Sequence, residues 1–251
     1  MRPQVLKRLT SVKKHVIASG DPDRLFMLTG LLDESEVVFN QRGIVVINGR
    51  RRDLEITLTS HGIGCPMASI IFEELWMLGA RWIVRLGTAG SLTPDIRVGD
   101  VVLASGAGYK GEGCGVNMYS PGIHCGASPD PFTLVGLYEE LVKIGVNPVV
   151  APVFTSDAFY AEENLAESIL KRGFKVVDME TASLYMLSWI RGFNATSVLV
   201  VSNVIPLKTE LKTSNELEEA FTKVFSATLN YFEKRSHQQR VGEISLSHQL
   251  E

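Results

Sequence analysis

Two short stretches of the chain combine small residues with an arginine. They are Gly20-Asp21-Pro22-Asp23-Arg24 and Arg85-Leu86-Gly87-Thr88-Ala89-Gly90, and each follows an apolar run typical of a buried strand. Accessible backbone N–H groups and the planar fork of arginine hold the oxygens of a small oxyanion in a fixed geometry. Together with Arg42, these stretches indicate a phosphate pocket in which phosphate could be a reactant rather than part of a nucleotide.

Each arginine also has a structural interpretation. Taken alone, the stretch around Arg24 is more typical of an ordinary turn with a surface arginine. Arg85 ends a very apolar run, and burying a charge without a partner costs several kcal/mol. It therefore needs an anion, either a protein carboxylate such as Glu73 or Glu74 or a bound ligand, and the two options stay open.

A third group of residues could hold a sugar and a flat ring. The two oxygens of Glu180 can accept hydrogen bonds from vicinal hydroxyls such as those of ribose, although an acid at a helix start also favours the helix dipole. Phe159 and Tyr160 could stack on a heterocycle or belong to the core. We interpret Asp157 and His61 as structural.

The elements that must position these residues follow from apolar patterning. Runs bounded by Gly, Asp or Pro predict strands at residues 15–19, 37–40, 43–47, 55–60, 82–86, 100–104, 149–154, 175–177 and 195–202. Helical spacing predicts helices at residues 66–78, 130–144, 162–171, 181–190 and 215–232. Their alternation indicates an α/β fold, a single domain with a mixed central sheet flanked by helices, whose polar loops gather at the carboxyl ends of the strands.

We expect the domain to cover residues 1–236 and a flexible C-terminal tail to cover residues 237–251. Ser214 is the expected cap of the last helix. The glycine-rich residues 106–128 are expected to form a surface loop that could close over a ligand.

Composition excludes several classes of function. The net charge is −3, from 25 basic and 28 acidic residues, which does not favour binding to nucleic acid or to anionic membranes. No apolar run approaches the roughly 18 residues of a membrane span, and no secretory pattern is present, so we expect a cytoplasmic protein. The three cysteines lack zinc-ligand spacing. Free thiols are expected, with a Cys114–Cys125 pair as the alternative.

Seven islands carry a resemblance to a known family: G-D-P-D-R, S-H-G-I-G-C-P, E-E-L-W-M-L-G-A, R-L-G-T-A-G-S-L, V-G-D, S-D-A-F-Y-A-E-E and D-M-E-T-A. In order and spacing the chain resembles the hexameric nucleoside phosphorylases, which share a fold with uridine and methylthioadenosine phosphorylases. The sixth island is most similar to archaeal purine and methylthioadenosine members. The resemblance implies a partly barrel-like sheet and phosphate-dependent cleavage of a nucleoside to free base and ribose 1-phosphate, as in nucleoside salvage. It also implies a homo-oligomer, a hexamer built from dimers, with no metal or organic cofactor.

The resemblance also implies a role for each matching residue. The phosphate ligands would be Gly20, Arg24, Arg85 and Thr88, with Arg42 supplied by a neighbouring subunit. The ribose would contact Met179, Glu180 and Met67, and Gln4 stands where the family carries a histidine that reaches a neighbour's 5′-hydroxyl. The base would contact Phe159, Ser202 and Asn203. The residues expected to carry catalysis are Arg24, Arg85, Glu180 and Asn203.

One departure from the family pattern bears on the base. Purine enzymes of this type carry an aspartate that protonates the base, and here the residue is Asn203. A carboxamide does not deliver a proton readily but can donate a hydrogen bond to a ring nitrogen or a 6-oxo group. We therefore favour 6-oxopurine nucleosides over adenosine. The family's supporting arginine is also missing, and Lys208 or Lys212 could partly replace it.

Three alternatives remain. A uridine phosphorylase is the first, although Glu163 and Leu165 stand where those enzymes carry the glutamine and arginine that read uracil. A nucleosidase would use water in place of phosphate and would have no use for three arginines. A non-catalytic nucleoside-binding protein is the third, because Asn203 and Gln4 replace functional residues of the family and a fold does not guarantee an activity.

Overall fold

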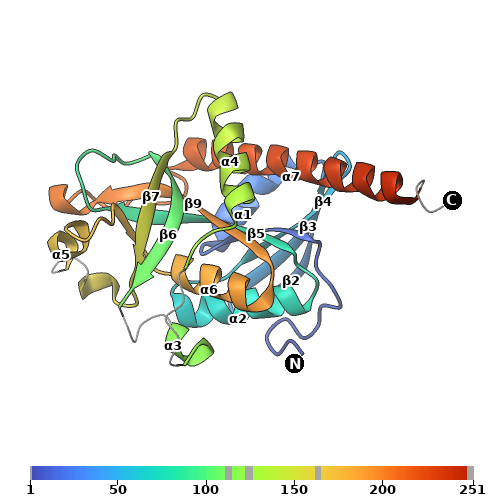
Figure 1. The fold of residues 1–251 in the computed structure, drawn as a ribbon, viewed down its shortest axis with the longest axis horizontal. Helices are drawn as coiled ribbons and strands as arrows, with labels where there is room; N and C mark the ends of the chain where they lie inside the picture. The colour runs from blue at the N-terminus through green and yellow to red at the C-terminus, as the bar shows by residue number, and fades with distance from the viewer. Residues whose placement is uncertain (1, 111–114, 122–126, 162–164, 248–251) are drawn as a thin grey trace.

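The structure, a computed structural model, describes residues 2–110, 115–121, 127–161 and 165–247. Within these ranges the strands form one mixed sheet in the order β2-β3-β4-β1-β5-β8-β7-β6-β9 (Figure 1). The strands are β1 (His15–Ser19), β2 (Glu34–Gln41), β3 (Ile44–Arg51), β4 (Leu54–Ser60), β5 (Trp82–Ser91), β6 (Val101–Tyr109), β7 (Val149–Thr155), β8 (Val176–Asp178) and β9 (Asn194–Val204).

The long strand β5 joins two parts of this sheet. Its first half pairs with β1 in parallel, and its whole length pairs with β9 in parallel. Because β9 also pairs with β6, β6 with β7, β7 with β8, and β8 with the end of β5, these five strands close on themselves. The expected mixed and partly barrel-like sheet is confirmed.

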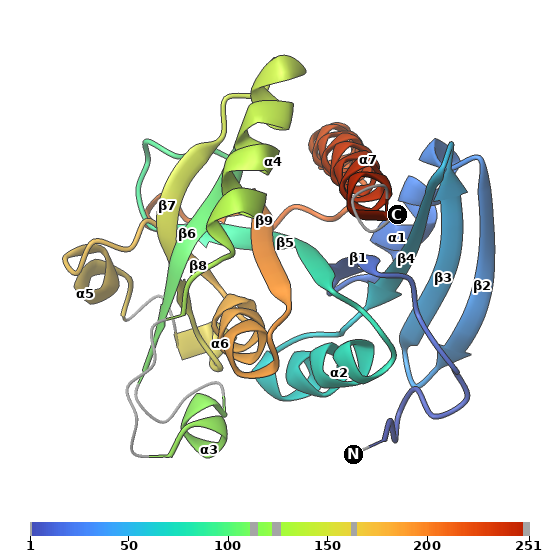
Figure 2. The same cartoon turned by 45° about the vertical axis from the view of Figure 1, so that its right-hand side comes forward.

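Helices cover both faces of the sheet (Figure 2). They are α1 (Pro22–Leu28), α2 (Cys65–Met77), α3 (Val116–Tyr119), α4 (Pro131–Lys143), α5 (Ala166–Leu170), α6 (Thr181–Arg191) and α7 (Glu218–Ser247). Helices α2 and α6 contact each other on one face, and α7 contacts α4 and α1 on the other. The buried apolar side chains form two large cores. Successive residues of β5 alternate between them, since Ile83 packs in one core and Val84 in the other. Over the described ranges, no helix is both long and apolar enough to cross a membrane.

Strand β6 corrects the expectation of a loop over residues 106–128. Residues 106–109 continue β6 and pair with β7 up to Thr155. The glycines fit this strand because another segment approaches closely: a Cβ on Gly108 would lie 2.2 Å from the Phe174 ring. Cys114 and Cys125, with the question of their pairing, lie outside the described residues.

Two helices differ from the sequence interpretation. Asp21 accepts a hydrogen bond from the Asp23 N–H at 2.9 Å and caps α1, so Gly20–Arg24 starts a helix and is not an isolated turn. At the other end, α7 continues to Ser247, and most of the segment expected as a flexible tail is helical. No proline interrupts α7, and a started helix gains one hydrogen bond per added residue. The boundary at residue 236 stays a prediction.

Candidate functional site

A cavity of about 1040 Å³ lies at the carboxyl ends of β1, β5, β8 and β9. Most residues that the sequence assigned to a site line it: Gly20, Arg24, Arg85, Thr88, Phe159, Met179, Glu180, Ser202 and Asn203. They come from segments far apart in the chain, brought together by the parallel pairing of β5 with β1 and β9. Gln4, Arg42 and Met67 do not line this cavity.

Arg24, from α1, lines the cavity but is almost fully buried, so it is not a surface residue. Its Nη1 donates to Ser19 Oγ and to the Leu86 carbonyl, each at 2.9 Å, and its Nη2 donates to Ser214 Oγ at 3.1 Å. The guanidinium also lies 4.0 Å from the centre of the Phe221 ring. Burial lowers the pKa of Arg24 to about 10, so the group remains a cation at neutral pH.

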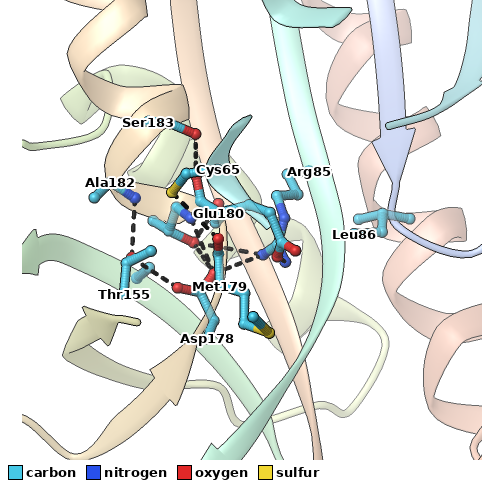
Figure 3. Close-up of polar contacts among 12 residues, drawn as sticks. Cys65, Arg85, Leu86, Thr155, Asp178, Met179, Glu180, Ala182 and Ser183 are labelled. Atoms are coloured by element: carbon cyan, nitrogen blue, oxygen red, sulfur yellow. Dashed lines mark hydrogen bonds and ion pairs between the residues drawn. The ribbon is translucent and has the colours of Figure 1, made fainter. Parts of the chain in front are cut away.

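Arg85, from β5, points at the turn between β8 and α6 (Figure 3). Its Nη1 donates to Asp178 Oδ2 at 2.9 Å, and its Nη2 donates to Glu180 Oε2. All three side chains are almost fully buried. Although burial opposes the charge, Glu180 and Asp178 together raise the pKa of Arg85 above its ordinary value. Arg85 is therefore a permanent cation in this cavity.

The carboxylates suggested by the sequence as partners of Arg85 are engaged elsewhere. Glu73 pairs with Arg191 through two oxygens. Glu74 accepts the backbone N–H groups of residues 4–6. Of the two options left open, Arg85 does pair with protein carboxylates, but they are Asp178 and Glu180 and not the suggested Glu73 or Glu74. Those parts of α2 face α6 and the N-terminal segment, while Arg85 faces the β8–α6 turn.

In both arginines one nitrogen, Nε, makes no hydrogen bond to the described residues. The Nε–H groups of Arg24 and Arg85 are buried, and neither has an acceptor within the described ranges. Both guanidinium groups line the cavity, so an anion bound there would meet two cations. Two such cations at one cavity suit an anion with several oxygens. A Cβ on Gly87 would lie 2.4 Å from Arg85 Nη1, which explains the glycine in this part of β5.

Glu180 precedes the first residue of α6, and both of its oxygens accept hydrogen bonds. Oε1 accepts the Gly64 N–H at 2.7 Å, and Oε2 accepts from Arg85. Burial raises the pKa of Glu180 above its ordinary value, while Arg85 opposes that shift. A ligand that takes over the Arg85 donor would free Oε2 to accept hydrogen bonds from hydroxyl groups.

Asp178 is the main residue that sequence reasoning missed. Its side chain is fully buried, and four donors surround it. Oδ2 accepts from Arg85, from the Thr181 N–H at 3.0 Å and from Thr181 Oγ1 at 2.5 Å, while Oδ1 accepts from Thr155 Oγ1 at 2.8 Å. The available signal was a charged residue at the end of an apolar run. Arg85 was singled out by the same signal.

The other end of the cavity is less charged. Ser202 Oγ lies 3.3 Å from Asn203 Oδ1, and the half-exposed Phe159 presents its ring at the rim. Lys208 lines this end with a left-handed backbone, φ 49°. Lys212 also lines it, but its ammonium pairs with Glu216 at 2.8 Å. The suggestion that Lys212 replaces the missing arginine is therefore weakened.

The three remaining candidates do not line the cavity. Arg42 is exposed in the β2–β3 turn with φ 58°, and Gln4 is exposed near the N-terminus. Met67 packs behind the cavity wall: its Sδ lies 2.1 Å from the place of a Cβ on Gly62, which must be glycine. His61 is fully buried and contacts the Gly62 carbonyl, consistent with a structural role, and Glu163 lies outside the described residues.

The sequence of the chain is similar to those of known nucleoside phosphorylases. The sequence model of the Phosphorylase superfamily matches residues 14–231. The purine nucleoside phosphorylase DeoD-type of Limosilactobacillus reuteri is 32% identical over 85% of this chain and 91% of its own length. The guanosine phosphorylase of Halorubrum lacusprofundi is 32% identical over 80% of this chain and 82% of its own.

Solved structures give the same result. The purine nucleoside phosphorylase of Toxoplasma gondii in complex with immucillin-H superposes with a TM-score of 0.78 at 25% identity, covering 89% of this chain and 93% of that one. The uridine phosphorylase of Vibrio fischeri ES114 gives 0.76 at 27% identity, covering 88% and 91%. The resemblance carried by the sequence islands is confirmed, and the chain belongs to the Phosphorylase superfamily.

Proposed function

We propose that the protein is a nucleoside phosphorylase, which transfers the ribosyl group of a purine nucleoside to inorganic phosphate and gives free base and ribose 1-phosphate. One observation carries the proposal: two buried arginines line one cavity beside a buried glutamate. The names of the purine nucleoside and guanosine phosphorylase relatives support it.

Phosphate is the proposed nucleophile, held by Arg24 and Arg85 with Gly20 and Thr88 beside them. Cleavage of an N-glycosidic bond passes through an oxocarbenium-like sugar that carries positive charge. A dianion held below the sugar stabilises that charge and then attacks C1′. The C1′–N bond breaks as the C1′–O bond forms, and the electron pair leaves with the base. The arginines therefore act by positioning and electrostatics.

Glu180 is the proposed ribose ligand, with Met179 packing alongside the sugar. A carboxylate with both oxygens presented can accept hydrogen bonds from the 2′- and 3′-hydroxyls. Oε2 of Glu180 accepts a hydrogen bond from Arg85. Bound phosphate would accept the Arg85 N–H that Glu180 Oε2 accepts here. The sugar hydroxyls would then donate to Oε2 in its place.

The base is proposed to stack on Phe159 and to contact Ser202 and Asn203. The Asn203 amide can donate a hydrogen bond to the 6-oxo group or a ring nitrogen as negative charge builds on the leaving base. This donor favours 6-oxopurine nucleosides, in line with the guanosine phosphorylase relative. The chemistry needs no metal or organic cofactor, because phosphate is the co-substrate.

A homo-oligomer, a hexamer formed as a trimer of dimers, belongs to the proposal, as does a cytoplasmic location. Arg42 and Gln4 are exposed and stand away from the cavity, which supports their acting in the site of a neighbouring subunit. Exposed apolar side chains on α4, Phe132 and Val135 among them, support a buried subunit contact.

The test measures base release from inosine, guanosine, adenosine, methylthioadenosine and uridine, each with and without phosphate. We expect release only with phosphate and fastest with inosine or guanosine. Equal release without phosphate would instead indicate a nucleosidase. Preference for uridine would indicate the uridine phosphorylase alternative, and binding of nucleosides without turnover would indicate a non-catalytic protein.

A further inference from the structure

Ser214 does not cap the last helix as the sequence suggested. The neighbouring Thr213 forms a reciprocal pair with Glu216: the Thr213 N–H donates to Glu216 Oε2 at 2.9 Å, and the Glu216 N–H donates to Thr213 Oγ1 at 3.3 Å. This arrangement is a capping box at the turn of residues 214–217, which leads into α7. The Ser214 hydroxyl is thereby left for another contact.

That contact is with the floor of the phosphate site. Ser214 Oγ accepts from Arg24 Nη2 at 3.1 Å and donates to Asp21 Oδ2 at 2.5 Å. The residue is 9% exposed, so little water competes for these bonds. With Ser19 and Leu86 holding Nη1, the Ser214 hydroxyl fixes the orientation of the guanidinium about its long axis.

The hydroxyl also keeps a carboxylate away from Arg24. Within the described ranges no carboxylate reaches Arg24 at ion-pair distance, whereas Arg85 contacts two. The Ser214 hydroxyl lies between Asp21 and Arg24, because it donates its proton to Asp21 and accepts a hydrogen bond from Arg24. The charge of Arg24 is therefore less neutralised by the protein than that of Arg85, which leaves Arg24 the stronger attraction for an incoming anion.

Ser214 further connects the two ends of the cavity. It ends the segment 208–214, which follows β9 in the chain and lines the cavity. The Lys212 N–H donates to the Ser202 carbonyl at 2.9 Å, and the Val204 N–H donates to Thr209 Oγ1 at 2.7 Å. The segment thus ties the strand that carries Asn203 to the arginine proposed to hold phosphate.

We propose that Ser214 is a positioning residue for phosphate binding, acting through Arg24. This inference rests on the proposed function. Loss of the hydroxyl would free Nη2, allow Asp21 to pair directly with the guanidinium and change the orientation of the guanidinium at the phosphate site. The effect belongs to phosphate binding and not to the base or the sugar.

The experiment compares Ser214→Ala and Ser214→Thr with a matched control, Ser188→Ala. Ser188 is also buried, and its hydroxyl donates to the Tyr185 carbonyl within α6, away from the cavity. For Ser214→Ala we expect the phosphate KM to rise about tenfold, the size of one lost hydrogen bond to a charged group, with kcat and the nucleoside KM within about twofold. Ser214→Thr should restore most of the phosphate affinity, and Ser188→Ala should match the wild type.

A binding readout separates this inference from the proposed function. Phosphate should raise the Tm of the wild type, relative to chloride at equal ionic strength, and raise that of Ser214→Ala much less at the same concentration. That loss supports the role of Ser214 even if no nucleoside is turned over. An unchanged phosphate KM and Tm shift in Ser214→Ala would overturn it while phosphorolysis stands. Equal losses in kcat and nucleoside KM would also overturn it, and a wild type with no response to phosphate would overturn both proposals.

Discussion

Arg85 and Asp178 form a buried ion pair in which Nη1 lies 2.9 Å from Oδ2. Two threonines also donate to Asp178, so this carboxylate is anchored by the protein itself. Glu180, which contacts the other nitrogen of Arg85, has one further donor, the Gly64 N–H. The two acids therefore differ in role: Asp178 holds the arginine, and Glu180 is available to exchange partners when substrates bind.

The first prediction concerns the shape of Arg85. Arg85→Lys keeps the charge but loses the planar fork, so kcat/KM for phosphate should fall about 100-fold while the protein stays folded. Arg85→Ala should in addition unfold easily, because two buried carboxylates lose their cation, at a cost of about 3–5 kcal/mol. Steady-state kinetics and urea unfolding measure the two effects.

The matched control is Arg191→Lys. Arg191 forms a comparable ion pair with Glu73 away from the cavity, so its replacement should leave phosphorolysis near the wild-type rate. Wild-type kinetics in Arg85→Lys would remove Arg85 from the phosphate site.

The second prediction concerns the acid limb of the reaction. Glu180 must be ionised to accept hydrogen bonds from sugar hydroxyls, and burial raises its pKa. As the pH falls, Glu180 therefore takes up its proton earlier than an exposed glutamate would, and kcat/KM should decline at correspondingly higher pH. Glu180→Gln should lower kcat about 100-fold and remove this limb of the profile.

The profile is measured as kcat/KM for the nucleoside at saturating phosphate. Glu167→Gln, an exposed glutamate on α5, is the control and should keep the wild-type profile. An acid limb that persists unchanged in Glu180→Gln would assign it to another group.

The third prediction concerns the base. Asn203→Asp restores a side chain that can carry a proton to the leaving purine, so adenosine turnover should rise at least about tenfold relative to guanosine. Asn203→Ala should slow both substrates. The ratio of kcat/KM values for the two nucleosides is the measurement, and an unchanged ratio in Asn203→Asp would show that Asn203 does not read the base.

The fourth prediction concerns stability. His15 stacks on Trp82, packs against Phe232 and faces Lys14 and Arg235. Burial and these cations lower its pKa from 6.5 to about 4. Between these values the unfolded chain binds a proton that the folded chain does not. The free energy of unfolding should therefore fall as pH drops from about 6.5 to about 4, by at most about 3 kcal/mol from this residue.

His15→Phe should flatten that dependence, because a phenyl ring keeps the packing and cannot be protonated. Urea unfolding of the wild type and the variant at about pH 7 and about pH 5 measures the difference. The exposed His237, replaced by Phe, is the control. Equal slopes in the wild type and His15→Phe would contradict the assignment.

The sequence predicted the sheet well, because its buried strands are apolar runs bounded by turn residues. It did not predict which partners the buried charges take. Arg24 looked like a surface residue because its partner Phe221 lies nearly 200 positions along the chain, on α7. The partner of Arg85 depends on the register of β8 against β5, which is set by tertiary packing.

At the start of the last helix the prediction of the capping residue was wrong. The T-x-x-E spacing of Thr213 and Glu216 was present in the sequence and predicts a capping box at Thr213. The prediction of a cap at Ser214 did not take this spacing into account. The position freed in this way is the one that contacts Arg24, which no local pattern could reveal.

In the proposed reaction phosphate itself attacks the sugar, and the product identifies the attacking group most directly. Phosphorus NMR of the enzyme with guanosine and phosphate should show ribose 1-phosphate appearing in step with free guanine. Release of guanine with free ribose and no new phosphorus signal would contradict the account.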